Sequence, residues 1–136
     1  MGPEPELIED EDRWRLPYRG MQVTQLRVDH QLTLVLDTAE IQLETDGILT
    51  RGALGAPHVT PVHLAPERQD VAPALALFGA TVLSAVAFKS GTLRLVFSTG
   101  THLNVKAHPD YEAWTVRGPG RLLLVSQPGG GVALWS

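Results

Sequence analysis

The chain contains no cysteine among its 136 residues. This absence excludes disulfide bonds, zinc sites built on thiolates and a cysteine nucleophile. It is compatible with a reducing cytoplasm, which is the compartment we expect for the protein. The sequence also lacks a basic leader segment and any apolar run near the roughly 18 residues that a membrane-spanning helix needs. We therefore expect no membrane association.

The chain has no basic stripe either, and its charge is unevenly placed. The net charge is −4 at pH 7, from 11 Lys and Arg against 15 Asp and Glu. Several of the acids crowd into residues 4–12. Nucleic-acid surfaces need clustered basic residues with aromatic residues between them, so we expect no nucleic-acid partner. The charge and low apolar content of residues 1–13 predict a disordered acidic tail.

The sequence does contain an internal repeat. Residues 21–45 and residues 81–106 both read as three short strands joined by tight turns. Repeated three-stranded units that each bury one face usually pack against each other. We therefore interpret residues 14–136 as a single β-rich domain with an internal duplication.

The repeat can be aligned through the middle strand of each unit. In this alignment Leu26 falls against Val86. Alternation of apolar and polar residues predicts that each middle strand buries one face. The predicted inward residues are Leu32, Leu34 and Leu36 in the first unit and Leu93, Leu95 and Phe97 in the second.

The predicted fold class is mainly β. Two related three-stranded meanders and a C-terminal hairpin, with its turn at residues 128–131, would form a curled antiparallel sheet that is barrel-like or sandwich-like. Two separate layers are the alternative. Trp135 is expected to be wedged into the sheet, because a free indole would expose a large apolar surface.

One short helix is predicted near residues 70–79. A proline lies in its first turn and a glycine follows its last residue, as is typical of helix boundaries. Val71, Leu75 and Phe78 would then share one apolar face. We expect this face to cover one opening of the curled sheet, or to lie between the two layers.

The C-terminal part of the chain combines several short motifs. These are Pro109-Asp-Tyr-Glu-Ala-Trp114, Gly118-Pro-Gly120, Pro128-Gly-Gly130 and a final Trp135. In this combination the chain resembles a family of small uncharacterised actinobacterial proteins, each a single domain of unknown function. That family often has an acidic residue after Pro-Gly-Gly, where this chain has Gly131. The resemblance implies one domain of this length and no established activity.

The densest polar cluster lies beside two aromatic residues, Tyr111 and Trp114. Its members are His102, His108, Asp110 and Glu112. A histidine with two carboxylates can serve in general acid–base catalysis or hold a metal. Asp after Pro is also typical of a turn, and the aromatic residues suit anchors at the edge of a sheet.

Three functions remain open from the sequence. The first is a non-enzymatic protein-binding module, such as an immunity-type or accessory protein, with a binding surface at His108, Asp110, Tyr111, Glu112 and Trp114. The second is a small-ligand-binding β domain that uses the interior of the curled sheet. The third is an enzyme that uses the four-residue polar cluster.

We favour the non-enzymatic hypothesis and assign no catalytic, cofactor-binding or metal-binding residue. His58 and His63 lie five positions apart in a proline-rich segment without a close carboxylate, so we do not assign a metal to them. The expected partner is another protein. Open edge strands also leave room for a homodimer.

Overall fold

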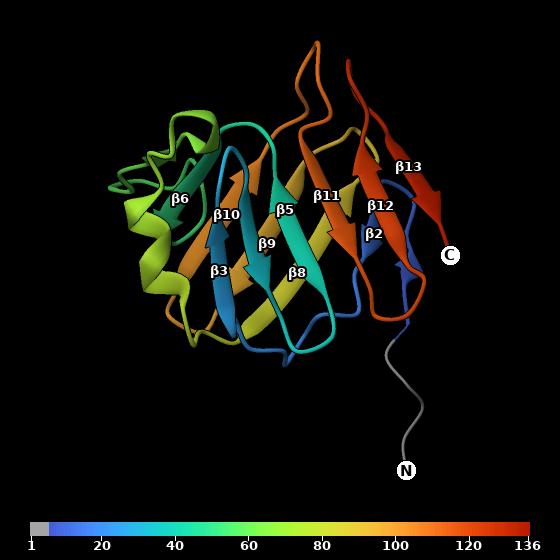
Figure 1. Ribbon diagram of the computed structural model, residues 1–136, viewed down its shortest axis with the longest axis horizontal. Helices are drawn as coiled ribbons and strands as arrows, with labels where there is room; N and C mark the ends of the chain where they lie inside the picture. Colours follow the sequence, from blue (N-terminus) through green and yellow to red (C-terminus); the bar gives the residue numbers. More distant parts are fainter. Residues whose placement is uncertain (1–5) are drawn as a thin grey trace.

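The computed structural model describes residues 6–136 and consists mainly of β-strands (Figure 1). The first seven strands are β1 Ile8–Glu9, β2 Arg13–Arg15, β3 Gln25–Val28, β4 Leu32–Val35, β5 Glu40–Leu43, β6 Gly47–Arg51 and β7 Val62–Leu64. The others are β8 Val82–Phe88, β9 Leu93–Phe97, β10 Thr101–Val105, β11 Trp114–Arg117, β12 Leu123–Ser126 and β13 Val132–Trp135. Two 3₁₀ helices, η1 Pro66–Arg68 and η2 Ala72–Leu77, lie between β7 and β8.

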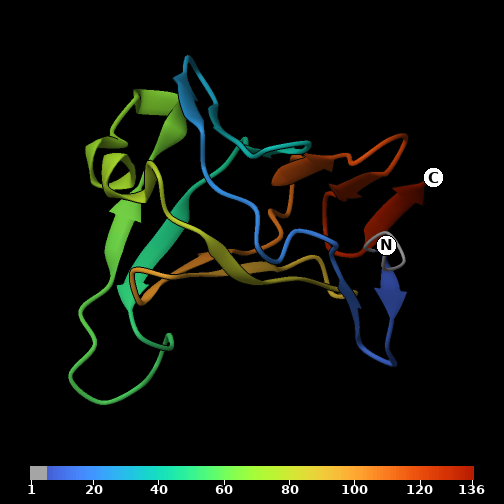
Figure 2. The ribbon, with the colours of Figure 1, turned by 90° about the horizontal axis from the view of Figure 1, so that it is seen from below.

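The strands form two antiparallel sheets. The first sheet has seven strands in the order β1-β2-β8-β9-β10-β6-β7, and the second has six in the order β13-β12-β11-β5-β4-β3. Figure 2 shows the two sheets on opposite sides of the domain interior. The mainly β prediction is confirmed, whereas no closed barrel forms within residues 6–136 and neither finer form of the predicted sheet is established.

Each predicted meander is present and lies in its own sheet. Strands β3, β4 and β5 are consecutive neighbours in the second sheet, and β8, β9 and β10 are consecutive neighbours in the first. The chain then crosses over twice in the same way. After the first meander β6 joins the other sheet beside β10, and after the second meander β11 joins the other sheet beside β5. The two crossing segments therefore bring both halves of the chain together.

The pairing register differs from the sequence alignment at the first strand of each meander. Leu26 pairs with Leu34, and the residue that pairs with the equivalent Leu95 is Ala85, not Val86. The turn between β8 and β9 is longer than the turn between β3 and β4. The number of positions that separates equivalent residues of the two halves therefore changes along the chain. A shift of one residue moves a side chain to the other face of a sheet. The common topology is a finding, and the sequence duplication itself stays a prediction.

The core lies between the two sheets. The predicted inward residues of β4 and β9 are all buried, and so are Tyr18 and Trp114. The Tyr18 hydroxyl donates a hydrogen bond of 2.7 Å to the Gly118 carbonyl, which satisfies its polar end inside the core. Burial of one leucine contributes about 1.5–3 kcal/mol, so this shared interior holds the two sheets against each other.

The N-terminal segment is more ordered than the sequence predicts. Residues 1–5 of the predicted tail lie outside the described residues. From residue 8 the chain forms strand β1, which pairs with β2, and β2 in turn pairs with β8. Lys89 contributes an ion pair of 2.6 Å with Glu9. The expectation of disorder is therefore wrong for the part that enters this sheet.

The predicted helix near residues 70–79 is not an α-helix. The structure has the 3₁₀ helix η2 there, and the buried residues are Val71, Ala74 and Leu77. Their spacing of three is the period of a 3₁₀ helix, whereas the prediction assumed the α-helical period. Leu75 and Phe78, which the α-helical period assigned to the buried face, are 64% and 65% exposed.

Trp135 does not wedge into the core. It lies on the edge strand β13 and is 55% exposed, so the expectation of a buried C-terminal indole is wrong. The hairpin itself is confirmed, because β12 and β13 pair across the turn at residues 128–131.

Candidate functional site

A groove lies where the two crossing segments pass each other. Residues 44–46 lead from β5 to β6, and residues 106–113 lead from β10 to β11. The backbone N–H groups of Glu44 and Thr45 donate to the Ala113 carbonyl at 2.9 and 3.2 Å. These hydrogen bonds hold the two segments side by side, so residues distant in sequence line one surface.

Gly47 allows this close crossing. A Cβ at Gly47 would lie 3.1 Å from Leu43 and 3.3 Å from Leu103, closer than the neighbouring side chains easily tolerate. The lack of a side chain therefore lets the chain pass from β5 of the second sheet to β6 of the first at this point.

Two adjoining cavities of about 390 and 510 Å³ form the groove. Both are lined by Glu44, Glu67 and Tyr111. We call their combined lining the crossing groove. Its other residues are Gln31, Thr45, Asp46, Ile48, His63, Asn104, Lys106, Ala107, His108 and Glu112.

Glu44 is the most unusual side chain of the groove. Its Oε1 accepts hydrogen bonds from the Nε2 atoms of Gln31 at 3.3 Å and Gln42 at 3.2 Å. Its Oε2 is buried and has no hydrogen-bond partner. Burial raises the pKa of the Glu44 carboxyl, and the nearby Glu112 raises it further. The hydrogen bond from Gln42 and the charge of Arg117 oppose this pKa shift but do not cancel it.

The groove carries an excess of negative charge. Glu44, Asp46, Glu67 and Glu112 contribute four carboxylates, and none of them forms an ion pair within residues 6–136. Lys106 is the one lysine or arginine in the lining of the two cavities. Unpaired carboxylates around a partly buried one favour a positively charged ligand, because such a ligand would relieve their repulsion.

Tyr111 and His108 form the aromatic rim of the groove. Tyr111 is 65% exposed, and its ring centroid lies 5.0 Å from that of His108 with the rings tilted by 40°. The His108 Nδ1 accepts hydrogen bonds from the backbone N–H groups of Asp110 at 3.0 Å and Tyr111 at 3.3 Å. His108 therefore fixes the loop that presents Tyr111, and only its Nε2 is left for a ligand.

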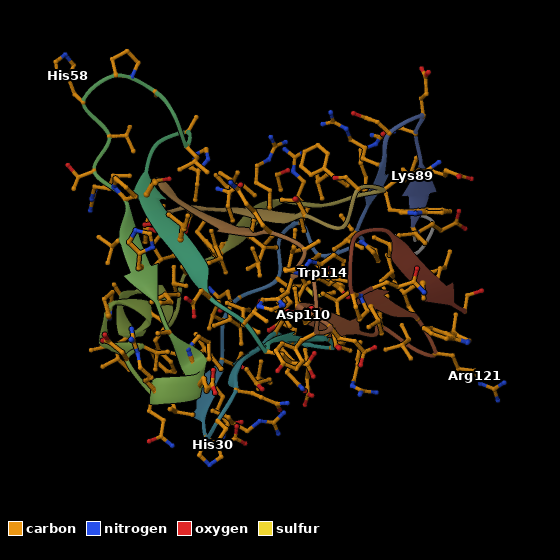
Figure 3. All side chains as sticks on the ribbon, turned by 90° about the horizontal axis from the view of Figure 1, so that it is seen from above. His30, His58, Lys89, Asp110, Trp114 and Arg121 are labelled. Carbon is orange, nitrogen blue, oxygen red and sulfur yellow. The ribbon has the colours of Figure 1, made fainter. Side chains whose placement is uncertain are left out.

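The structure brings together only some of the predicted site residues. His108, Tyr111 and Glu112 line the groove. Asp110 is exposed in the same loop but does not line either cavity. Trp114 is fully buried, where its Nε1 donates to the Gly91 carbonyl at 2.8 Å, so it cannot contact a ligand (Figure 3).

The proposed catalytic cluster does not converge. His102 lies on β10 opposite Val96 and Thr50 and does not line the crossing groove. Nor do His58 and His63 form a pair: His63 lines the groove, whereas His58 lies at the tip of a projecting loop (Figure 3). Across the described part of the chain no three His, Asp or Glu side chains are placed to hold a metal.

Sequence reasoning missed Glu44, Gln31, Gln42 and Asn104. Asn104 lies on β10, and its Nδ2 is buried without a partner in the same cavity as Glu44. In the sequence Gln42, Glu44 and Asn104 look like polar positions on the solvent face of strands. Gln31 looks like part of a turn. Only the double crossing, which no local pattern encodes, places Gln31, Glu44 and Asn104 in one groove. Gln42 supports it by donating a hydrogen bond to Glu44.

The fold and groove define a β-rich domain of two antiparallel sheets with an acidic groove at the crossing of its two halves. The chain belongs to a family of unknown function, DUF6188, whose match covers residues 14–136. No curated protein and no solved structure matches the chain. None of the helices in residues 6–136 is long and apolar enough to cross a membrane.

Proposed function

We propose that the protein is a non-enzymatic protein-binding module of the bacterial cytoplasm, of the immunity or accessory type, whose crossing groove receives a basic side chain of its partner. The observation that carries this proposal is the buried, unpaired Oε2 of Glu44, surrounded by carboxylates that form no ion pair.

An arginine or lysine fits the chemistry of the groove. A guanidinium or ammonium group can donate a hydrogen bond to a carboxylate oxygen that has no partner, and a guanidinium can also stack on an aromatic ring. Glu44 offers the carboxylate and the exposed Tyr111 offers the ring. Each interaction contributes more when the pair is shielded from water, as it would be once a partner covers the groove.

The geometry favours binding over catalysis. An acid–base mechanism needs its titratable groups within hydrogen-bond reach of one reacting atom. His102 and Asp110 lie outside the cavities that hold His108 and Glu112. Tyr111 and Glu112, which the sequence assigned to a binding surface, are in contrast both at the groove.

A peptide titration tests this proposal. The probe is acetyl-Gly-Arg-Gly-amide, added to the ¹⁵N-labelled protein, with the citrulline peptide as an uncharged isostere. We expect shifts of the amide signals of Thr45, Tyr111 and Glu112 with the arginine peptide and none with citrulline. Because the interaction is electrostatic, added salt should weaken it.

The matched variants are Glu44→Gln and Glu11→Gln, which remove the same charge from the groove and from an exposed site. The first should abolish the shifts and the second should preserve them. Equal shifts with arginine and citrulline, or shifts that survive Glu44→Gln, would show that the groove does not select a basic side chain.

A second candidate is a small polar ligand in the same groove. The unpaired Nδ2 of Asn104 and Oε2 of Glu44 line one cavity, so a molecule with one acceptor and one donor group would satisfy both. Native mass spectrometry of protein purified gently from its own host separates the candidates. An added mass of a few hundred daltons supports the small ligand, and one of protein size supports the binding module.

A further inference from the structure

The edge strand β13 differs from the other three sheet edges. β1 has only two residues and includes Glu9, β7 follows directly after Pro61, and β3 carries Arg27, which forms an ion pair of 2.8 Å with Glu40. Short length, proline and charge each protect an edge from pairing with another chain. β13 has the sequence Val-Ala-Leu-Trp, without charge or proline, and its outer edge pairs with no strand of the described chain.

The hairpin register shows which backbone groups face the open edge. Gln127 donates its N–H to the Gly131 carbonyl at 3.0 Å, and Val125 lies opposite Ala133 two positions along. In an antiparallel ladder only alternate pairs exchange hydrogen bonds. Ala133 and Trp135 therefore direct their backbone groups toward β12. The backbone groups of Val132 and Leu134 point outward.

The sheet face beside this edge is apolar. Ala133 pairs with Val125 and Trp135 pairs with Leu123, so these four side chains share the outer face of the second sheet. Trp135 is 55% exposed although it is among the largest apolar side chains of the protein. An exposed indole at an unprotected edge is typical of an interface.

We propose that β13 pairs in antiparallel orientation with β13 of a second copy of this chain, about a twofold axis at Ala133. In this register the outward groups of Val132 meet those of Leu134 in the second copy, so both sets are satisfied. Trp135 then lies opposite Gly131 of the second copy, which has no side chain to obstruct the indole. A twofold contact is reciprocal, so each of these pairs occurs twice and only Ala133 meets its own copy. The strand carries no charged side chain, so no like charges come together.

Sedimentation velocity of the full chain over a range of about 1 to 500 μM tests this proposal. The wild type should move from the monomer mass of 14.8 kDa toward twice that value as concentration rises. Ala133→Lys opposes two ammonium groups at the axis and should weaken the dimer by about a hundredfold. Val28→Lys adds the same charge to the exposed edge β3 and should leave the dimer unchanged.

A second measurement, made on the wild type, tests the proposal even if Ala133→Lys does not fold. Amide exchange of the wild type should show protection of Val132 and Leu134 that increases with concentration, while the amides of β3 show no such change. A wild type that stays monomeric at 500 μM would overturn the proposal. A dimer that survives Ala133→Lys, or is lost in Val28→Lys, would overturn it as well.

Discussion

The two tryptophans near the C-terminal end have opposite environments. Trp114 is fully buried and its indole nitrogen is hydrogen-bonded, whereas Trp135 is 55% exposed. We expect Trp114→Ala to lower the free energy of unfolding by about 3–5 kcal/mol, because it leaves a large cavity and removes one of the two hydrogen bonds to the Gly91 carbonyl. Trp135→Ala, measured at low protein concentration, should cost less than about 1 kcal/mol. Urea denaturation of both variants checks this, and equal losses would contradict the two environments.

Glu44 should make stability depend on pH in an unusual direction. Its pKa is raised above the ordinary value of 4.5, so between the pKa of the unfolded chain and that of the folded protein the folded state retains a proton that the unfolded chain has released. Stability contributed by this group is therefore present at acid pH and is lost as pH rises through the raised pKa.

We expect Glu44→Gln to raise the melting temperature at neutral pH and to have little effect below pH 4. Melting curves across this pH range provide the measurement, with Glu11→Gln as the control for a removed surface charge. A variant that is destabilised at neutral pH would mean that the Glu44 carboxylate is stabilising where it lies.

At the scale of elements, the turn between β8 and β9 links the two sheets. The Gly91 carbonyl accepts hydrogen bonds from the Trp114 Nε1 and the Ser126 Oγ, both at 2.8 Å. A Cβ at Gly91 would lie 2.8 Å from the Cβ of Ala107 and 3.2 Å from the backbone nitrogen of Gly131. This glycine therefore allows the turn of the first sheet to approach strands of the second.

The substitutions Gly91→Ala and Gly100→Ala distinguish two causes of lost stability. One is the close contact at Gly91, and the other is the cost of a positive φ in a residue with a side chain. Both glycines have positive φ, at 109° and 83°, but a Cβ at Gly100 would meet nothing within 4 Å. Gly100→Ala should cost about 1–2 kcal/mol through its backbone alone. Gly91→Ala should cost about 2 kcal/mol more because of the close contact. Thermal unfolding measures both, and similar losses would contradict the proposed close approach.

The sequence predicted those elements whose period is local. Alternation in β4 and β9 correctly gave the buried faces, because side chains of a strand alternate whatever lies beyond it. The prediction from the sequence failed at η2. The α-helical period was assumed there, whereas the buried residues Val71, Ala74 and Leu77 follow a period of three. The predicted burial of Trp135 also failed. Whether the last strand lies at a sheet edge depends on the order of the strands in the sheet and not on the residues of that strand.

At the scale of the whole molecule, the double crossing creates the candidate site. Tyr111 and Glu112 could be selected from the sequence because polar and aromatic residues gather in that loop. Glu44 could not, since its burial arises from a loop almost seventy positions away.

We propose that the crossing groove binds a basic side chain of a partner protein. The most direct measurement is photo-crosslinking from p-benzoylphenylalanine at Asp110, an exposed position beside the groove that leaves Glu44 and Tyr111 intact. We expect one protein adduct in the native host, attached next to an arginine or lysine, lost with Glu44→Gln and retained with Glu11→Gln. No protein adduct, or an adduct indifferent to Glu44→Gln, would contradict it.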